Sequence, residues 1–213
     1  MLHELKLPLK DKDVRAMQAG DQVLLSGTLL TARDAAHKWL VETLIEANQP
    51  TTPQDQAARN AITPILDHGA IYHCGPLIAG QISQSASTNA VQFISAGPTT
   101  SIRQEPYAHK VMAHFHVSAV IGKGGMGAAT LRACQQTPAV YLSVVGGAGA
   151  LIAGSIQRVI SVHKLEFGIP EAIWIIQVKD FPAVVTMDSH GQSLHDQVSL
   201  HSRDALERLL KQK

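Results

Sequence analysis

The sequence predicts an α/β domain in which helices flank a mixed, partly parallel β-sheet. Short apolar segments typical of buried strands alternate along the chain with segments of helical periodicity, and this alternation favours such a sheet. The 213 residues are 45% hydrophobic and 16% charged, which is the profile of a packed domain. No internal repeat or low-complexity tract interrupts the chain, so we expect residues 1–213 to form a single domain.

Local periodicity and turn residues place the individual elements. Strands are expected at residues 22–26, 70–73, 91–95, 117–121, 139–145, 172–178 and 183–187. Helices are expected at residues 10–19, 33–48, 107–116, 128–136, 150–162 and 202–211, with Thr31 as the N-cap of the second. We interpret residues 49–58 and 80–90 as loops and residues 188–191 as a turn.

Composition and charge argue against several classes of function. The formal net charge of +1 provides neither the basic excess of a nucleic-acid-binding domain nor a polybasic membrane patch. The first ten residues do not resemble a signal peptide, and no segment approaches the roughly 18 apolar residues that span a bilayer. The two cysteines, Cys74 and Cys134, indicate reduced thiols in a cytoplasmic protein.

Three segments follow a strand, contain glycine and carry a cation or hydroxyls. The first is SGTLLTARDAAH at residues 26–37. Arg33 would lie at a helix N-terminus, where it could bind a carboxylate through two parallel hydrogen bonds. The alternative is a solvated Arg33 that pairs with Asp34 or another nearby carboxylate.

The second segment is AGPTTSIR at residues 96–103. Three consecutive hydroxyls, Thr99, Thr100 and Ser101, precede Arg103 and form a dense set of donors. Such a loop can hold a carboxylate or phosphate. The alternative is a turn that only caps the next helix, although a cap needs a single hydroxyl.

The third segment, VIGKGGMG at residues 120–127, matches the G-x-G-x-x-G pattern of dinucleotide-binding loops. No acidic residue follows at the distance needed to hold a ribose, because the next one is Glu166. The pattern of a P-loop is absent as well, since Gly124 follows Lys123. The loop therefore favours a flexible backbone that brings Lys123 and several N–H groups close to a ligand.

Eleven histidines raise the question of a metal site. His109, His114 and His116 cluster, but their spacing does not resemble a zinc site, and no cysteine or carboxylate accompanies them. We therefore expect no metal ligands in this chain. His37 lies four residues after Arg33 and either faces the same cleft or is an ordinary packed or solvated histidine.

Taken together, these motifs resemble the C-terminal domain of class I fumarases, which also occurs as the β subunit of two-subunit fumarases and of L-tartrate dehydratase. The resemblance spans about residues 20–195. It rests on the three segments above and on IYHCGPL (71–77), YLSVVGGAGALIA (141–153), EFGIPEAIW (166–174) and VKDFPAVVTMDSHG (178–191). It implies a swivelling β/β/α domain.

The resemblance also implies a reaction, the reversible hydration of a dicarboxylate at a [4Fe–4S] cluster. Three cysteines of a separate α part hold that cluster in similar enzymes, so a chain with two cysteines is not expected to hold it. The start at Met1 fits a separate β subunit. We expect an α2β2 assembly whose active site is shared with a cluster-bearing α subunit.

Site residues follow from the same resemblance. Thr99 and Lys123 are the expected catalytic residues, although an unactivated threonine is a poor base and Thr99 could instead orient the substrate. The expected substrate-binding residues are Arg33, Thr99, Thr100, Ser101, Arg103 and Lys123. Two departures from the family pattern, Gln104 for methionine and Cys74 for alanine, leave the substrate open.

The leading hypothesis is therefore the β subunit of a hydro-lyase that interconverts fumarate and L-malate. Within the same chemistry, the alternative is L-tartrate dehydratase, which forms oxaloacetate. From other classes, a dinucleotide-binding oxidoreductase domain that uses residues 122–127 and a noncatalytic module that senses a dicarboxylate remain as alternatives.

Overall fold

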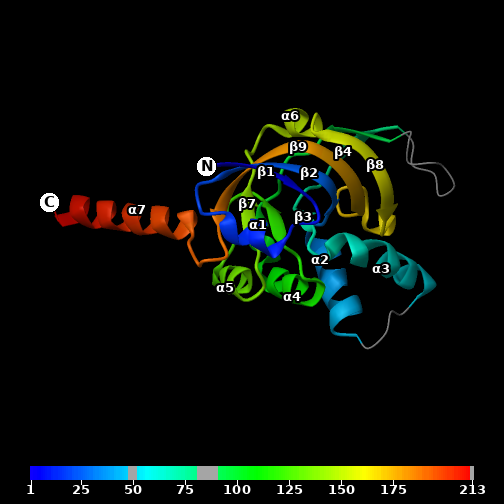
Figure 1. Ribbon diagram of the computed structural model, residues 1–213, viewed down its shortest axis with the longest axis horizontal. Helices are drawn as coiled ribbons and strands as arrows, with labels where there is room; N and C mark the ends of the chain where they lie inside the picture. Colours follow the sequence, from blue (N-terminus) through cyan, green and yellow to red (C-terminus); the bar gives the residue numbers. More distant parts are fainter. Residues whose placement is uncertain (48–51, 81–90, 212–213) are drawn as a thin grey trace.

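The computed structural model describes residues 1–47, 52–80 and 91–211 (Figure 1). Within these residues the main sheet has seven strands in the order β1-β2-β3-β6-β7-β9-β8. Their bounds are β1 Leu2–Lys6, β2 Gln22–Thr31, β3 Ala70–Tyr72, β6 Ala119–Gly122, β7 Val140–Ser143, β8 Ile156–His163 and β9 Ile173–Met187. A separate two-stranded sheet pairs β4 (Leu77–Ala79) with β5 (Gln92–Ser95).

The sheet is mixed and partly closed on itself. Strands β1, β2, β3, β6 and β7 are parallel to one another in that order. The long strand β9 runs antiparallel to β7 and β8 and also pairs with β2. Because β9 contacts both β7 and β2, the strands between them form a partial barrel. The predicted mixed sheet with flanking helices is confirmed.

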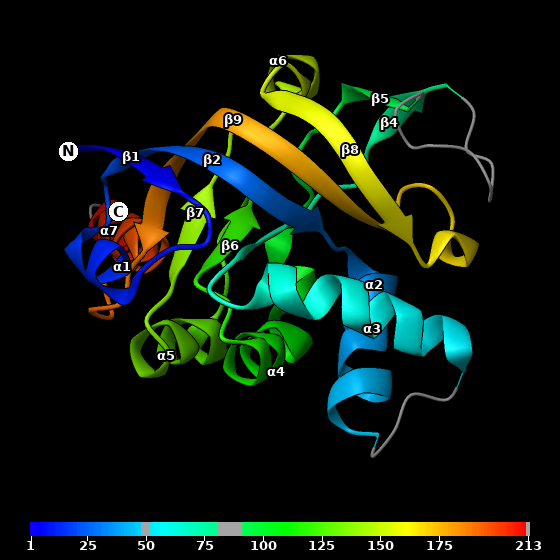
Figure 2. The same cartoon turned by 45° about the vertical axis from the view of Figure 1, so that its right-hand side comes forward.

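The helices lie on both sides of this sheet, as Figure 2 shows. Four of them cover one face: α2 (Asp34–Trp39), which continues as a π-helical turn (Leu40–Ile45), α3 (Pro53–Leu66), α4 (Glu105–Phe115) and α5 (Ala128–Gln136). The barrel interior is closed by α1 (Asp11–Ala16), α6 (Gly149–Ala153) and the β4–β5 sheet. The last helix, α7 (Leu194–Lys211), projects from the body (Figure 1).

Strand residues alternate between two apolar cores. Ile71 and Val120 pack under the helices, whereas their neighbours Tyr72 and Ile121 fill the barrel interior. A strand that is buried on both faces has no polar side, which explains why these strands are continuous apolar runs in the sequence. Burial on both faces holds the ends of the parallel strands in fixed positions.

One predicted helix is wrong. Residues 150–162 were expected to be helical, but the helix α6 ends at Ala153 and β8 begins at Ile156. The segment is rich in β-branched residues, which suit a strand, and pairing with β9 decides its conformation. The two strands expected at 172–178 and 183–187 are also one continuous strand, β9, in which Asp180 takes a positive φ of 51°.

The region between the second helix and β3 also differs from the prediction. The loop expected at 49–58 gives way at Pro53 to the helix α3, while its residues 49–51 lie outside the described part of the chain. Thr52 caps this helix by accepting a hydrogen bond from Asp55 N at 3.0 Å, and Pro53 follows it. The Thr-Pro pair is the start signal that could have revealed the helix. Thr31 is not an N-cap, because Arg33 holds that position and Thr31 is buried.

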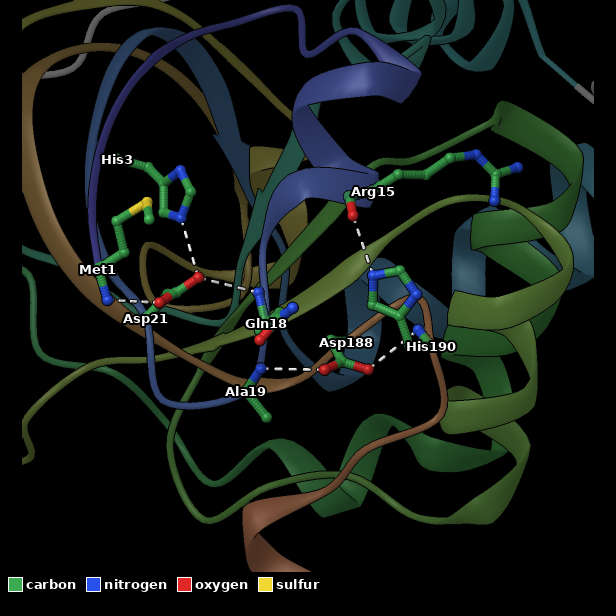
Figure 3. A network of polar contacts seen from close by, with 8 residues as sticks. All are labelled: Met1, His3, Arg15, Gln18, Ala19, Asp21, Asp188 and His190. Atoms are coloured by element: carbon green, nitrogen blue, oxygen red, sulfur yellow. Dashed lines mark hydrogen bonds and ion pairs between the residues drawn. The ribbon is translucent and has the colours of Figure 1, made fainter.

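A polar network joins the chain's first strand to the turn that precedes α7 (Figure 3). The Asp21 carboxylate accepts hydrogen bonds from the Met1 ammonium group at 2.5 Å and from Gln18 N at 3.0 Å. The ammonium group is the main reason that the pKa of Asp21 lies below its usual range. The Asp188 carboxylate accepts from Ala19 N and His190 N, each at 2.9 Å, and stabilises the predicted turn at 188–191. None of the described helices is long and apolar enough to cross a membrane.

Candidate functional site

Three of the singled-out segments meet at one edge of the sheet. Arg33 follows the carboxyl end of β2, His73 follows β3, and Lys123 follows β6. These strands are parallel neighbours, so their carboxyl ends lie side by side, which is where ligands bind in open α/β sheets. The edge therefore collects side chains that are far apart in the sequence.

The loop at residues 97–103 inserts between the loops that follow β3 and β6. Pro98 forms an antiparallel bridge with Cys74, and Thr100 forms a parallel bridge with Lys123. Thr99 N donates to His73 O at 2.7 Å, and Ser101 N donates to Lys123 O at 2.9 Å. We call the four loops 32–34, 73–75, 97–103 and 123–127 the crest, because main-chain bonds join the last three into one surface.

The side chain of Arg33 extends from its own loop to Gly75, in the next loop of the crest. Its Nε is 3.2 Å from Glu171 Oε1, an ion pair whose angle does not satisfy a hydrogen bond. A Cβ added to Gly75 would overlap Arg33 Nη1 and lie 2.9 Å from Arg33 Cδ, so the guanidinium occupies space that only glycine leaves open. No polar group of the described residues hydrogen-bonds to either Nη atom. The arginine fork is therefore available to a ligand.

Arg103 and Thr99 form a second pair of donors. Arg103 Nη2 donates to Thr99 Oγ1 at 2.8 Å, while Arg103 Nε lies 3.4 Å from Asp34 Oδ2. Gln104, which is fully buried, donates to the other Asp34 oxygen. Because Thr99 accepts a hydrogen bond from a cation, its own O–H proton remains available for donation.

Lys123 is half-buried, and no carboxylate of the described residues lies within ion-pair distance of its ammonium group. A Cβ added to Gly146, in the loop after β7, would lie 3.8 Å from Lys123 Nζ, so this loop borders the same space. Arg33 and Arg103 are each paired with a carboxylate, so the Lys123 ammonium carries the charge on the crest that attracts an anion.

Thr100 and Ser101 occupy different environments. Thr100 is exposed beside Lys123, whereas Ser101 is fully buried beneath the loop. The Ser101 hydroxyl accepts from Tyr141 OH at 2.9 Å and shares a hydrogen bond of 2.8 Å with His73 Nδ1. Burial raises the pKa of Tyr141 to about 12, so this phenol remains a donor. Ser101 thus anchors the loop at 97–103 to the buried side chains of Tyr141 and His73.

Two buried histidines lie under the crest. The rings of His37 and His73 are 4.9 Å apart in an edge-to-face arrangement, and His37 Nδ1 is 3.0 Å from Arg33 O. Burial lowers the pKa of His37 to about 4 and holds the pKa of His73 well below its usual range. Both are neutral near pH 7. The structure thus resolves the choice left open for His37 in favour of a packed residue.

A carboxylate of the chain itself binds the N-terminus of helix α5, which follows the loop at 122–127. The Glu105 carboxylate accepts from Gly127 N at 2.8 Å, Ala129 N at 2.9 Å and Thr130 Oγ1 at 2.6 Å. A Cβ added to Gly127 would lie 2.6 Å from this carboxylate, and one added to Gly122 would overlap the Ser101 hydroxyl. The glycines therefore serve internal packing. This arrangement argues against dinucleotide binding, because Glu105 fills the place of a pyrophosphate.

The residues present do not fit an iron–sulfur cluster. Cys74 lies in the barrel core and Cys134 lies under the helices, so the two thiols are on opposite faces of the sheet. Burial raises the pKa of each to about 12, which disfavours the thiolate form that binds iron. The described residues contain no group of three His, Cys, Asp or Glu side chains that could hold a metal ion.

Several residues of the site escaped the sequence reasoning. The sequence does not predict that Asp34 pairs with Arg103, and it predicts no role for Glu171, Glu105, His73 or Tyr141. Of these, all but Glu105 had a local signal, because Asp34, His73, Tyr141 and Glu171 each lie within a motif that carried the family resemblance. Their contacts span the sheet and have no signature in sequence spacing.

The fold is an α/β domain whose crest, at the ends of neighbouring parallel strands, carries Arg33, Arg103 and Lys123, a set of side chains suited to a small anion. The family model described as Fumarase C-terminus matches residues 3–198, and the chain belongs to this family.

The chain is also similar to individual members of the family. It is 42% identical over 202 residues to a protein of Geobacillus stearothermophilus with the provisional name fumarate hydratase class I, and spans 35% of that protein's length. It is 35% identical over 204 residues to a protein of Methanocaldococcus jannaschii provisionally named L(+)-tartrate dehydratase subunit beta, covering 95% of each chain. It is 34% identical over 191 residues to the L(+)-tartrate dehydratase subunit beta of Escherichia coli strain K12, covering 89% of this chain and 85% of that one.

Proposed function

We propose that the chain is the substrate-binding β subunit of a hydro-lyase that interconverts fumarate and L-malate. The observation that carries the proposal is the set of free donors on the crest. Among the described residues, no group hydrogen-bonds to the Nη atoms of Arg33 and no carboxylate pairs with the Lys123 ammonium, while the Thr99 O–H proton remains available; three neighbouring loops carry these donors. A dicarboxylate would provide acceptors for these donors and a negative charge beside Lys123.

The crest residues support this chemistry through electrostatics. Removal of a proton next to a carboxylate places a second negative charge on that end of the substrate. Donors from Arg33, Arg103 and Lys123 would stabilise this charge more in the transition state than in the ground state. An arginine fork binds both oxygens of a carboxylate and thereby fixes the plane of the substrate as well.

We propose that Thr99 is a donor to the substrate. Its oxygen already accepts a hydrogen bond from Arg103 Nη2 at 2.8 Å, which polarises the hydroxyl and leaves its proton directed away from the arginine. A role as the acid–base residue of the reaction requires Thr99 to lose that proton. The neighbouring cations Arg103 and Lys123 favour such a loss. Thr99→Val removes both roles and Thr99→Ser keeps both, so a loss of kcat in the first variant that the second restores would show that the hydroxyl is required.

The proposal includes a partner subunit that holds a [4Fe–4S] cluster. One observation supports a partner: the cysteines of this chain do not fit a cluster. The names of the tartrate dehydratase relatives describe β subunits, which favours a separate α chain in an assembly such as α2β2. The cluster would provide Lewis-acid chemistry at iron.

L-tartrate is the second candidate substrate. Relatives named as tartrate dehydratase β subunits are matched over 95% and 85% of their own length, whereas the fumarase relative is matched over 35% of its length but is more similar in sequence. Tartrate carries two hydroxyls, and the exposed Thr100 hydroxyl beside Lys123 is an additional polar group on the crest. The arginine and lysine donors suit either dicarboxylate, so substrate assays are needed to choose between fumarate and L-tartrate.

The test combines the chain with a cluster-bearing partner subunit under anaerobic conditions. We expect turnover of fumarate and L-malate to exceed that of L-tartrate, and no turnover by the chain alone. Preference for L-tartrate would select the second candidate. Activity of the isolated chain would contradict the proposal that the active site is shared with a partner. Tight binding of NAD(P) or FAD would favour the alternative of a dinucleotide-binding oxidoreductase domain. Binding of dicarboxylates without turnover in the complex would support a noncatalytic sensor.

A further inference from the structure

We infer that Glu171 is a positioning residue that fixes the guanidinium of Arg33 in a slot over Gly75 and so presents its two Nη atoms to the substrate. The inference rests on the proposed function, since it concerns how the same site holds a carboxylate. It assigns a role within the EFGIPEAIW motif at residues 166–174, which the proposed function leaves unexplained.

Glu171 is placed by the turn that leads into β9. Its backbone N–H donates to Gly168 O at 3.0 Å, and β9 begins two residues later at Ile173. One carboxylate oxygen accepts from Ala35 N, at the start of α2, at 3.0 Å. The other oxygen lies 3.2 Å from Arg33 Nε. The carboxylate is thus anchored to the main chain on one side and is free to orient the arginine on the other.

The slot over Gly75 fixes the opposite side of the guanidinium. A Cβ at Gly75 would overlap Arg33 Nη1 and would lie 2.8 Å from Pro170 O, so the space is bounded by the main chain before Glu171. Gly75 follows Cys74, whose bridge to Pro98 leads directly to Thr99. Burial raises the pKa of Cys74 to about 12, although the charge of Arg33 opposes this rise.

The arrangement explains why a half-buried carboxylate lies next to the proposed anion site. An unpaired Glu171 would repel a dicarboxylate, but its charge is directed to Arg33 Nε and Ala35 N. Arginine side chains lose substantial rotamer entropy when they are ordered, and prior ordering removes this cost from substrate binding. Without Glu171, the fork of Arg33 would sample several orientations, and the substrate would have to order it.

The first test is a double-mutant cycle in the complex with the partner subunit. We expect Glu171→Gln, which keeps an oxygen for Ala35 N, to raise KM for the dicarboxylate about tenfold or more with a smaller change in kcat. In an Arg33→Lys background the same substitution should have little further effect. Gly75→Ala, which fills the slot without changing charge, should also raise KM. Glu166→Gln in the same segment is the matched control, since Glu166 pairs with Lys164.

The second test needs no activity. Arginine side-chain NMR of the chain alone should show separate, slowly exchanging Nη signals for Arg33, assigned by their loss in Arg33→Lys, and these signals should merge in Glu171→Gln. Merged signals in the unsubstituted chain, or additive effects of Glu171→Gln and Arg33→Lys on kcat/KM, would overturn the inference. If the complex turns over no dicarboxylate, the proposed function fails, and the NMR comparison still decides whether Glu171 fixes Arg33.

Discussion

Lys164→Met should destabilise the protein by removing one partner of a buried ion pair. Lys164 Nζ lies 2.9 Å from Asp55 Oδ1, and the two side chains are only 11% and 6% exposed. The ammonium is also 5.2 Å from the ring centroids of Trp39 and Phe167. Burial alone would lower the pKa of Lys164, but hydrogen bonds to Glu166 and Asp55 outweigh burial and raise it. The pair ties the segment that carries Glu171 to the helix α3.

The magnitude follows from what the substitution leaves behind. Methionine replaces the volume of the lysine, so the main loss is the counter-charge of Asp55, which stays buried with Trp39 Nε1 at 2.9 Å as a donor. Removing one member of a buried pair costs about 3–5 kcal/mol of unfolding free energy. For a chain of this size, that corresponds to a fall of about 10 °C in Tm.

Denaturant and thermal unfolding measure this change against a matched control. Lys110 forms an ion pair of 2.6 Å with Glu46, but those side chains are 43% and 49% exposed. Lys110→Met should therefore cost less than about 1 kcal/mol, since solvent screens an exposed pair. Two results would refute the reasoning that burial makes the Lys164–Asp55 pair more stabilising than an exposed pair. One is an equal loss of stability in Lys110→Met and Lys164→Met. The other is a Tm for Lys164→Met within experimental error of the parent.

Three further predictions concern the crest. The unfolding free energy should fall as the pH drops from about 6.5 towards 4, because the unfolded chain protonates His37 and the folded chain does not. His37 alone accounts for a fall of about 3 kcal/mol over this range. In denaturant titrations at several pH values, His37→Phe should reduce this dependence of stability on pH. Ser101→Ala should destabilise the chain by about 1–3 kcal/mol, because Tyr141 and His73 lose their shared buried partner; an unchanged denaturation midpoint would count against the network. In the complex with the partner subunit, Arg103→Ala should lower kcat/KM by about 30-fold or more, as measured by steady-state kinetics. Arg158→Ala, on β8, is the control and should leave kcat/KM unchanged.

The sequence allowed many elements of the fold to be predicted because their signals are local. Buried strands such as β6 and β7 are continuous apolar runs, and helices such as α4 and α5 have apolar residues at helical spacing. The prediction failed where a partner strand decides the conformation. Residues 156–163 look locally compatible with a helix, but they pair with β9 along its length and become a strand.

For the candidate site, the sequence by itself identified the glycine-rich loops with their cations and hydroxyls, since strand, turn and helix signals lie next to one another in the chain. Their role in binding remains a prediction. Only the tertiary structure revealed the partners of those residues: Glu171 beside Arg33, Asp34 beside Arg103, and Tyr141 with His73 beneath Ser101. The reason is physical. Strand order brings together loops separated by tens of residues, and hydrogen bonds depend on that proximity and on direction, neither of which is encoded in local periodicity.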